Sequence, residues 1–195
     1  MEWNIPGTVL TGRRDRPDLV EDRIRSMFLG GGIVRSQVAA VTGLEPYTVQ
    51  NWVKRGYLSA PDRKRYSCRQ LCRIIIINML KSTMTLEQIC ELLRYINGQL
   101  DDESDDCIDD AELYFAFVQV AARIHGPKVE LPELRGIISD VLSGYREPVP
   151  GARARVEKVV LIMLLAWEAS VIQQTAQSLF TALNQAEKGE QPNGK

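Results

Sequence analysis

The sequence has little of what most catalytic sites are built from. It contains a single histidine, His125, among 195 residues, so a Ser–His or Cys–His mechanism has only one candidate base. The motifs G-x-G-x-x-G, G-x-x-x-x-G-K-S/T and G-x-S-x-G are absent, and the glycines at 30–32 are not followed by Gly-Lys. We expect that the protein is not an enzyme and uses no cofactor.

Cysteine and long apolar runs are also scarce. The four cysteines are too few for a disulfide scaffold. The chain starts Met-Glu-Trp-Asn, with no basic or apolar stretch typical of a signal peptide. Its longest apolar runs, Ile74–Ile77 and Val159–Trp167, are shorter than the roughly 20 residues that a membrane span needs. These features favour a cytoplasmic protein with reduced thiols and no membrane partner.

Charge is nearly balanced but segregated along the chain. The formal net charge is −1, yet residues 1–80 hold 13 of the 24 basic residues and only 7 of the 25 acidic ones. The remainder is correspondingly acidic. Such asymmetry indicates a basic module that binds a polyanion, followed by an acidic part with another role.

Helix start and stop signals recur along the chain, whereas strand-like alternation is rare. Pro17 and Pro46 suit the first turn of a helix, Ser36 can cap a short helix, and Gly43 can end it. Ser67 with Gln70, and Thr85 with Gln88, form two capping boxes. We expect helices near residues 17–28, 36–42, 46–55, 67–81, 85–97, 113–124, 132–143 and 152–187. The sequence therefore predicts an all-α fold with one small β element.

The segment 47–55 has the pattern of a recognition helix that follows a short helix and a turn. Val49, Trp52 and Val53 share an inner, apolar side. The candidate DNA contacts on this helix are Tyr47, Thr48, Gln50, Asn51, Lys54 and Arg55. Gln and Asn pair with adenine, and Lys and Arg pair with guanine or phosphate, so these residue types suit a major groove.

Three consecutive cations, Arg63, Lys64 and Arg65, follow a Pro-Asp turn signal. We expect them to form a wing, a two-stranded hairpin beside the recognition helix that contacts the flanking phosphates. Between residues 51 and 73 the sequence has only one acid, Asp62. The same stretch has seven cations: Lys54, Arg55, Arg63, Lys64, Arg65, Arg69 and Arg73. The alternative is a charged, solvated face.

The segment LEPYTVQNWVKRGYLSAPDRKRYS, followed by a helix and MTLEQICELL, resembles the winged helix-turn-helix of the MerR regulators. The stretches NWVKRGYL and KRYSCRQLCRIIIINMLK carry a stronger resemblance, over about residues 10–120, to a bacterial MerR-like family of unknown function. The resemblance implies a DNA-binding fold. The sequence departs from the MerR pattern at Gln50 and Asn51, where that pattern has Arg and Tyr.

Together these observations predict a dimeric, DNA-binding transcriptional regulator whose partner is double-stranded DNA. The expected organisation is an N-terminal extension with one helix (1–35), the winged helix-turn-helix (36–98), an acidic loop (99–112), a helical dimerisation or effector region (113–188) and a tail (189–195). The C-terminal helices are expected to form a homodimer, and two alternatives stay open: they serve only as its interface, or they also bind a small ligand or a partner protein. The alternative is a protein-interaction module that keeps the helix-turn-helix only as a scaffold.

Three further features leave alternatives open. Arg13, Arg14 and Arg16 precede the basic module, and a covering helix is favoured over an arm that reaches DNA. Cys68 and Cys72 lie one helical turn apart, but a tetrahedral metal site needs two more ligands, so burial is favoured. Acids at Asp101, Glu103, Asp105, Asp109 and Glu112 have the spacing of a calcium loop, although Asp106 occupies its glycine position. The alternative is a solvated loop in which Asp109 or Asp110 caps the next helix.

Overall fold

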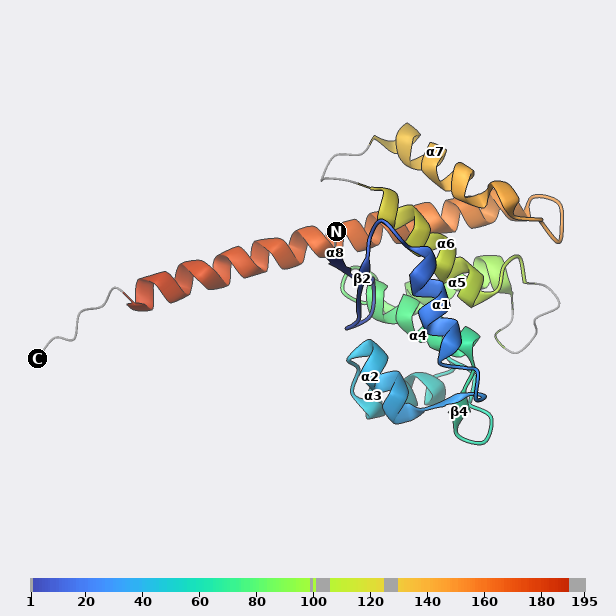
Figure 1. Cartoon of the computed structure of the whole chain (residues 1–195), viewed down its shortest axis with the longest axis horizontal. Helices are drawn as coiled ribbons and strands as arrows, with labels where there is room; N and C mark the ends of the chain where they lie inside the picture. Colours follow the sequence, from blue (N-terminus) through green and yellow to red (C-terminus); the bar gives the residue numbers. More distant parts are fainter. Residues whose placement is uncertain (1, 99, 101–105, 125–129, 190–195) are drawn as a thin grey trace, which may run out of the picture.

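The computed structural model describes residues 2–98, 100, 106–124 and 130–189 (Figure 1). It is mostly helical, with two small two-stranded sheets, which confirms the predicted helical class. The elements are β1 (Glu2–Asn4), β2 (Thr11–Arg13), α1 (Asp18–Ser26), β3 (Ile33–Val34), α2 (Arg35–Thr42), α3 (Pro46–Lys54), β4 (Arg65–Tyr66), α4 (Cys68–Leu80), α5 (Leu86–Asn97), α6 (Asp110–Arg123), α7 (Leu131–Val141), the 3₁₀ turn η1 (Leu142–Gly144) and α8 (Ala152–Gly189).

Helix α4 lies at the centre of the body. All four side chains of its Ile74–Ile77 run are fully buried, which an apolar run on every side of a helix requires. Helix α6 packs along α4, and the first half of α8 packs against α4, α5, α6 and α7. One buried cluster extends from Ile5 in the N-terminal segment to Leu164 in α8, so the segments distinguished in the sequence share a single core.

The N-terminal segment holds a strand pair that the sequence pattern did not predict. Strands β1 and β2 are antiparallel and pair Trp3 with Gly12. The Arg14 guanidinium donates hydrogen bonds to the carbonyls of Ala121 (3.1 Å) and Ala122 (3.3 Å) and lies 5.5 Å from the Trp3 ring centroid. Arg14 therefore satisfies carbonyls at the end of α6, where a helix has no partners of its own. This supports the expected covering role of the segment and removes Arg14 from any DNA-binding arm.

Most predicted helix ends are confirmed. Ser67 and Thr85 cap α4 and α5 through the two capping boxes, and α3 begins at Pro46. The predicted cap at Ser36 is wrong. The N-cap of α2 is Val34, two residues earlier, because β3 runs directly into the helix and the Gln37 side chain accepts the Val34 N–H at 2.9 Å.

The acidic segment is shorter as a loop than predicted. Helix α6 starts at Asp110, and the Asp109 carboxylate caps it by accepting the Ala111 N–H at 2.7 Å. Glu112 pairs with Arg25 of α1. Asp101, Glu103 and Asp105 lie outside the described residues, as does His125. Among the residues that the structure does describe, no three His, Cys, Asp or Glu side chains converge as a metal site would require.

Candidate nucleic-acid interface

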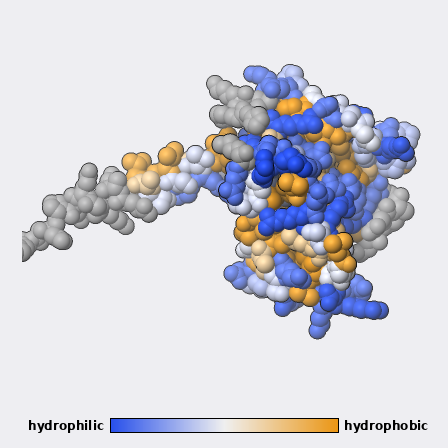
Figure 2. All heavy atoms as spheres, viewed as in Figure 1, coloured by the Kyte–Doolittle hydropathy of each residue, from blue (hydrophilic) through white to orange (hydrophobic). Residues whose placement is uncertain are grey.

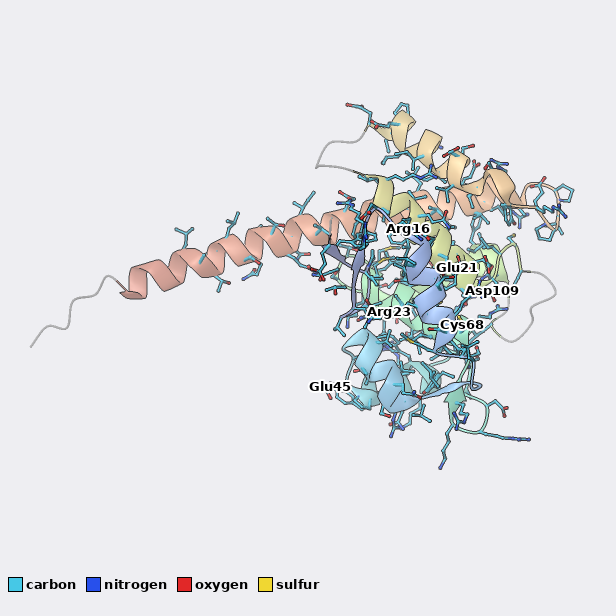
Figure 3. All side chains as sticks on the ribbon, viewed as in Figure 1. Arg16, Glu21, Arg23, Glu45, Cys68 and Asp109 are labelled. Carbon is cyan, nitrogen blue, oxygen red and sulfur yellow. The ribbon has the colours of Figure 1, made fainter. Side chains whose placement is uncertain are left out.

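Helices α2 and α3 form a compact pair at the edge of the body opposite α7 (Figure 1). The turn Gly43–Glu45 joins them, and Glu45 at the start of α3 lies at the outer edge (Figure 3). The Gly43 N–H donates to the Ala39 carbonyl at 2.8 Å, with Gly43 at φ +68°, the left-handed geometry of a helix C-terminus. The side chains that the pair buries are Val38, Val41, Leu44, Val49 and Trp52.

Burial of that inner side leaves the opposite side of α3 to solvent. Tyr47 is 63% exposed, and Gln50, Asn51 and Lys54 are exposed. Thr48 is half-buried. The structure thus presents one aromatic, two amide side chains and a cation on a single helix, which are residue types that pair with base edges or phosphates.

The 61–66 turn, which holds the three consecutive cations, has an unusual backbone. The Arg65 N–H donates to the Asp62 carbonyl at 2.7 Å, and the two residues between them lie at positive φ: Arg63 at +45° and Lys64 at +66°. Two consecutive left-handed residues define the tight turn that normally prefers Asn-Gly, since side chains with a Cβ are strained there. The strained backbone positions of this turn are therefore occupied by two cations, Arg63 and Lys64.

The strand that follows this turn does not pair as predicted. An isolated bridge joins Asp62 to Arg65, but β4 pairs antiparallel with β3, with Ile33 opposite Tyr66 and Val34 opposite Arg65. The expected local hairpin is thus mainly a long-range pairing. Because β3 runs directly into α2, this pairing joins the base of the turn to the helix pair.

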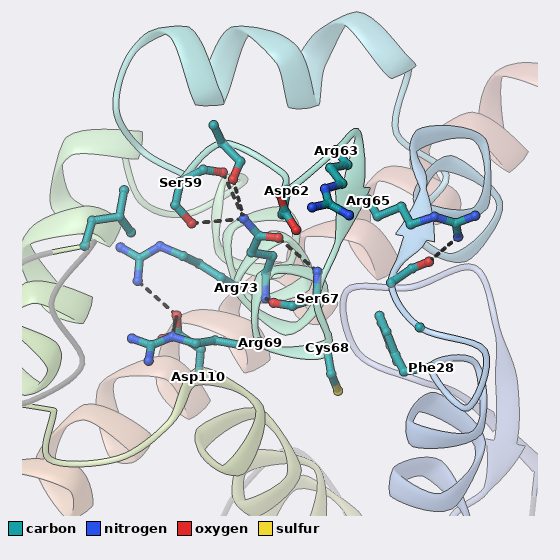
Figure 4. A pocket seen from close by; sticks show the side chains of 15 residues that line it. Phe28, Ser59, Asp62, Arg63, Arg65, Ser67, Cys68, Arg69, Arg73 and Asp110 are labelled. Carbon is teal, nitrogen blue, oxygen red and sulfur yellow. Dashed lines mark hydrogen bonds and ion pairs between the residues drawn. The ribbon is translucent and has the colours of Figure 1, made fainter.

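Two further contacts fix the turn to the body (Figure 4). The Gln70 side-chain amide donates to the Ser59 hydroxyl at 3.0 Å and to the Ala60 carbonyl at 3.1 Å. The Arg65 guanidinium donates to the Gly32 carbonyl at 2.7 Å. Both ends of the cationic turn are therefore held, although its tip is exposed.

A cavity of about 810 Å³ lies between α3, the start of α2 and the 61–66 turn. Its lining includes Gln50 and Lys54 of α3 and Lys64 of the turn. Arg35, the first residue of α2, lines it as well. None of its lining residues is acidic. The structure thus brings three of the predicted site residues together and adds Arg35, which the sequence analysis missed. Its signal in the sequence was a cation directly before the helix predicted over 36–42.

Arg63 and Arg65 lie on the other side of the turn. They line a cleft of about 780 Å³ together with Asp62 and Gly32 (Figure 4). Hydrophilic residues project from this lower end of the body, where Figure 1 places α3 and β4 (Figure 2). The predicted site is therefore divided between two sides of one protruding, cationic turn.

Arg55 is held by the protein itself. Its guanidinium donates to Glu87 of α5 at 2.9 Å and to the Tyr57 hydroxyl at 2.6 Å, and it lies 4.7 Å from the Tyr57 ring centroid. The Tyr57 hydroxyl also donates to Glu87, which lowers the pKa of that carboxylate and raises the pKa of Tyr57. Arg55 therefore belongs to a surface network between α3 and α5.

Two of the seven cations counted in the sequence turn inward. Arg73 is only 7% exposed; it contacts Asp110 of α6 at 3.1 Å and donates to the Tyr57 carbonyl at 3.1 Å. Asn97 of α5 donates to the same carboxylate at 3.0 Å. Burial raises the pKa of Asp110, and the Arg73 charge opposes that rise.

Arg69, the second of these cations, contacts Asp106 at 2.6 Å. Part of the acidic segment therefore neutralises part of the basic one.

A comparison with known protein families matches the part of the chain that contains this candidate interface. Residues 33–117 match a domain of unknown function, DUF1836. The matched span begins at β3 and ends within α6, so it contains the α2–α3 pair, the cationic turn and the Arg73–Asp110 pair. The expected similarity to an uncharacterised family is confirmed for this span.

One relative comes from the curated proteins. The chain is 33% identical over 89 residues to the uncharacterized protein YkrK of Bacillus subtilis (strain 168). The aligned part is 44% of this chain, and it spans only 38% of the length of that relative. No solved structure matches the chain.

Proposed function

We propose that the protein is a transcriptional regulator that binds double-stranded DNA with α3 in the major groove. The observation that carries the proposal is the acid-free cavity where Gln50 and Lys54 of α3 face Lys64 of the turn and Arg35 of α2. A recognition helix beside a cationic wing needs this arrangement, because the helix contacts bases while the flanking cations contact the backbone.

In this proposal α3 carries the sequence-reading groups. Gln50 and Asn51 contact base edges, Lys54 contacts a guanine or a phosphate, and Tyr47 contacts the sugar–phosphate backbone. Helix α2 supports α3 from behind through the buried Val38 and Trp52. Arg55 is left out of the contact set because Glu87 holds its guanidinium.

The 61–66 turn acts as the wing. Its tip places Arg63 and Lys64 in a backbone conformation that costs stability, and strain of this kind is concentrated at functional sites. The β3–β4 pairing sets the base of the wing against α2, so helix and wing would meet the same duplex. The resemblance to MerR regulators, carried by Thr48, Gly56 and Tyr66 among others, supports the same assignment.

Fluorescence anisotropy with a random-sequence duplex of about 30 base pairs, between 50 and 200 mM salt, tests the proposal. Wild type is expected to bind at low salt. The variant Arg63→Ala/Lys64→Ala/Arg65→Ala is expected to bind more weakly, and its slope of log K against log salt should be shallower by up to roughly 0.9 per lost phosphate contact.

A matched control removes the same charge elsewhere. Arg135, Arg146 and Arg155 are exposed on α7, the following loop and α8, away from the proposed interface. Their triple alanine variant should bind nearly as wild type does. If both triple variants weaken binding equally, only net charge matters and the wing has no special role. No binding by wild type at 50 mM salt would favour the protein-interaction module instead.

A further inference from the structure

Helix α8 has two different halves. Its first half is buried in the body through Val156, Val160, Met163 and Leu164. Beyond Ser170 the helix leaves the body and projects into solvent (Figure 1). Hydrophobic residues nevertheless continue along the projecting part (Figure 2): Val171, Ile172, Leu179, Phe180 and Leu183 are between 39% and 65% exposed.

Six exposed apolar residues of α8 follow a regular spacing, and we call this line the α8 seam; Val171 and Phe180 lie off it. Its members are Leu165, Ala169, Ile172, Ala176, Leu179 and Leu183, all exposed and separated by four, three, four, three and four residues. This is the 3.5-residue repeat by which two helices pack along a common line. The α8 seam is about 27 Å long at 1.5 Å per residue.

A membrane span is the obvious competing explanation, and the structure argues against it. By length and composition, Ala152–Leu183 is apolar enough to cross a membrane, which the short apolar runs did not predict. The apolar run 159–164 within it, however, is already packed in the core: five of its six side chains are buried and Ile162 is half-buried. The projecting part carries Gln173, Gln174 and Gln177 around the helix, and bilayer hydrocarbon would leave these amides without partners.

We infer that the α8 seam pairs antiparallel with the α8 seam of a second copy of this chain, an inference that goes beyond the DNA-binding proposal. Antiparallel packing centred on residue 174 places Leu165 opposite Leu183, Ala169 opposite Leu179, and Ile172 opposite Ala176. Each alanine thus receives a large side chain, and the two surfaces are identical, as a two-fold interface requires. Parallel packing would instead place alanine against alanine and leave gaps between the large residues.

The absence of charge from most of the projecting helix fits the same arrangement. Residues 169–183 contain no Asp, Glu, Lys or Arg. Paired charges beside the packing line normally set the partner and direction of two helices. Here only the alternation of small and large side chains can set the direction, and that alternation is complementary to itself in the antiparallel sense.

A groove in the body extends the interface beyond the two helices. A cavity of about 980 Å³ lies between α8, the N-terminal segment and the end of α4, and Trp3, Ile5 and Met79 contribute apolar walls. Ile172 and Leu179 line it from α8, so the groove borders the α8 seam. Fewer than three heptads are too few for a free-standing coiled coil, and this groove adds the contact area that the second α8 needs.

Sedimentation equilibrium of the full chain, without DNA, tests the inference separately from the proposed function. The expected mass is twice the chain mass of 22.0 kDa. Ile172→Asp should raise the dissociation constant at least about 100-fold, because a two-fold interface contains the changed residue twice. Gln177→Asp places the same charge on another side of the same exposed helix and should leave the dissociation constant unchanged.

Disulfide trapping tests the direction. In a Cys68→Ser background, a tagged Ile172→Cys chain mixed with an untagged Ala176→Cys chain should form the mixed disulfide, whereas Ala176→Cys alone should not cross-link. Efficient cross-linking of Ala176→Cys alone would overturn the antiparallel arrangement. A wild-type chain that stays monomeric at all concentrations would overturn the inference. Co-sedimentation with phosphatidylcholine vesicles would also overturn it, because the α8 seam would then bind a lipid surface instead of a second copy.

Discussion

At the scale of single residues, the Arg73–Asp110 pair shows why the count of cations in the sequence overstated the cationic surface of the proposed interface. Asp110 is 1% exposed and lies between Arg73 and Asn97, so loss of its carboxylate leaves a buried guanidinium without a counter-charge. We predict that Asp110→Ala lowers the free energy of unfolding by about 3–5 kcal/mol, measured by urea denaturation.

An exposed Arg–Asp pair provides the control. Arg123 pairs with Asp140, whose side chain is 66% exposed, so Asp140→Ala should cost no more than about 1 kcal/mol. The double variant Arg73→Met/Asp110→Leu should recover much of the loss, because it removes both buried charges. Equal costs for Asp110→Ala and Asp140→Ala would show that the buried pair has no special weight.

The cysteines differ sharply in environment. Cys68 is half-buried, whereas the other three are buried. A hydrogen bond from Cys72 lowers the pKa of Cys68, with a contribution from the Arg25 charge, while burial raises the pKa of Cys72 and Cys90. A lower pKa increases the thiolate fraction near neutral pH, and thiolate is the reactive form.

Iodoacetamide at pH 7 should therefore alkylate Cys68 first, as followed by mass spectrometry of the native protein. The other three thiols should react at a comparable rate only in urea. Faster reaction of Cys90 than of Cys68 in the folded protein would contradict this account of the thiol environments.

At the scale of elements, the two residues at the tip of the proposed wing lower the stability of the fold, whereas the DNA-binding proposal needs their charges. Arg63→Asn/Lys64→Gly places the favoured residues at the two positive-φ positions, so it should raise the free energy of unfolding by roughly 1–2 kcal/mol. The same variant should weaken DNA binding, because it removes two cations.

The variant Arg63→Ala/Lys64→Ala separates the two effects. It removes the same charge but keeps the strain, so it should weaken DNA binding without a comparable gain in stability. Urea denaturation and anisotropy on the same samples measure both quantities. A gain in affinity on relief of the strain would mean that the turn is not a phosphate contact.

The turn between α2 and α3 depends on one glycine. Gly43 lies at φ +68°, and a Cβ there would come within 2.6 Å of Val9 Cγ1, so Gly43→Ala adds a clash to the backbone strain. Gly56 also has a positive φ, but a Cβ there would meet nothing within 4 Å.

We therefore predict that Gly43→Ala destabilises the protein more than Gly56→Ala does, by at least about 1 kcal/mol in thermal or urea unfolding. Val9→Ala in the Gly43→Ala background should return part of the difference. If the two glycine variants unfold alike, the contact with the N-terminal segment does not constrain the helix pair.

The elements that could be predicted from the sequence are those set by neighbouring residues. Ser67 with Gln70, Thr85 with Gln88, and Pro46 each act within one helical turn, and the structure has all three where the sequence placed them. Ser36 failed as a cap because a strand pairing from outside the segment set where α2 begins. Arg35 was missed for the same reason, since only the folded turn brings it beside Lys64.

At the scale of the whole molecule, the unpredicted features are contacts between distant segments. Arg73 and Asp110 are 37 residues apart, and the paired residues of β3 and β4 are 33 and 31 residues apart. Neither pairing can be predicted from neighbouring residues. In the sequence, Arg73 and Asp110 look like two separate solvated charges, and β3 and β4 are strands of only two residues each. The candidate site was accordingly predicted by residue type, while its division into two sides of the turn emerged only from the fold.

The most direct test of the central claim is a ¹H–¹⁵N spectrum of the labelled protein titrated with a short random-sequence duplex at low salt. We predict that the amide shifts change at Gln50, Asn51 and Lys54 on α3 and at Arg63 and Lys64 on the wing, with little change along the projecting part of α8. Changes confined to α8, or no change at all, would contradict a DNA-binding role for the α2–α3 pair and its wing.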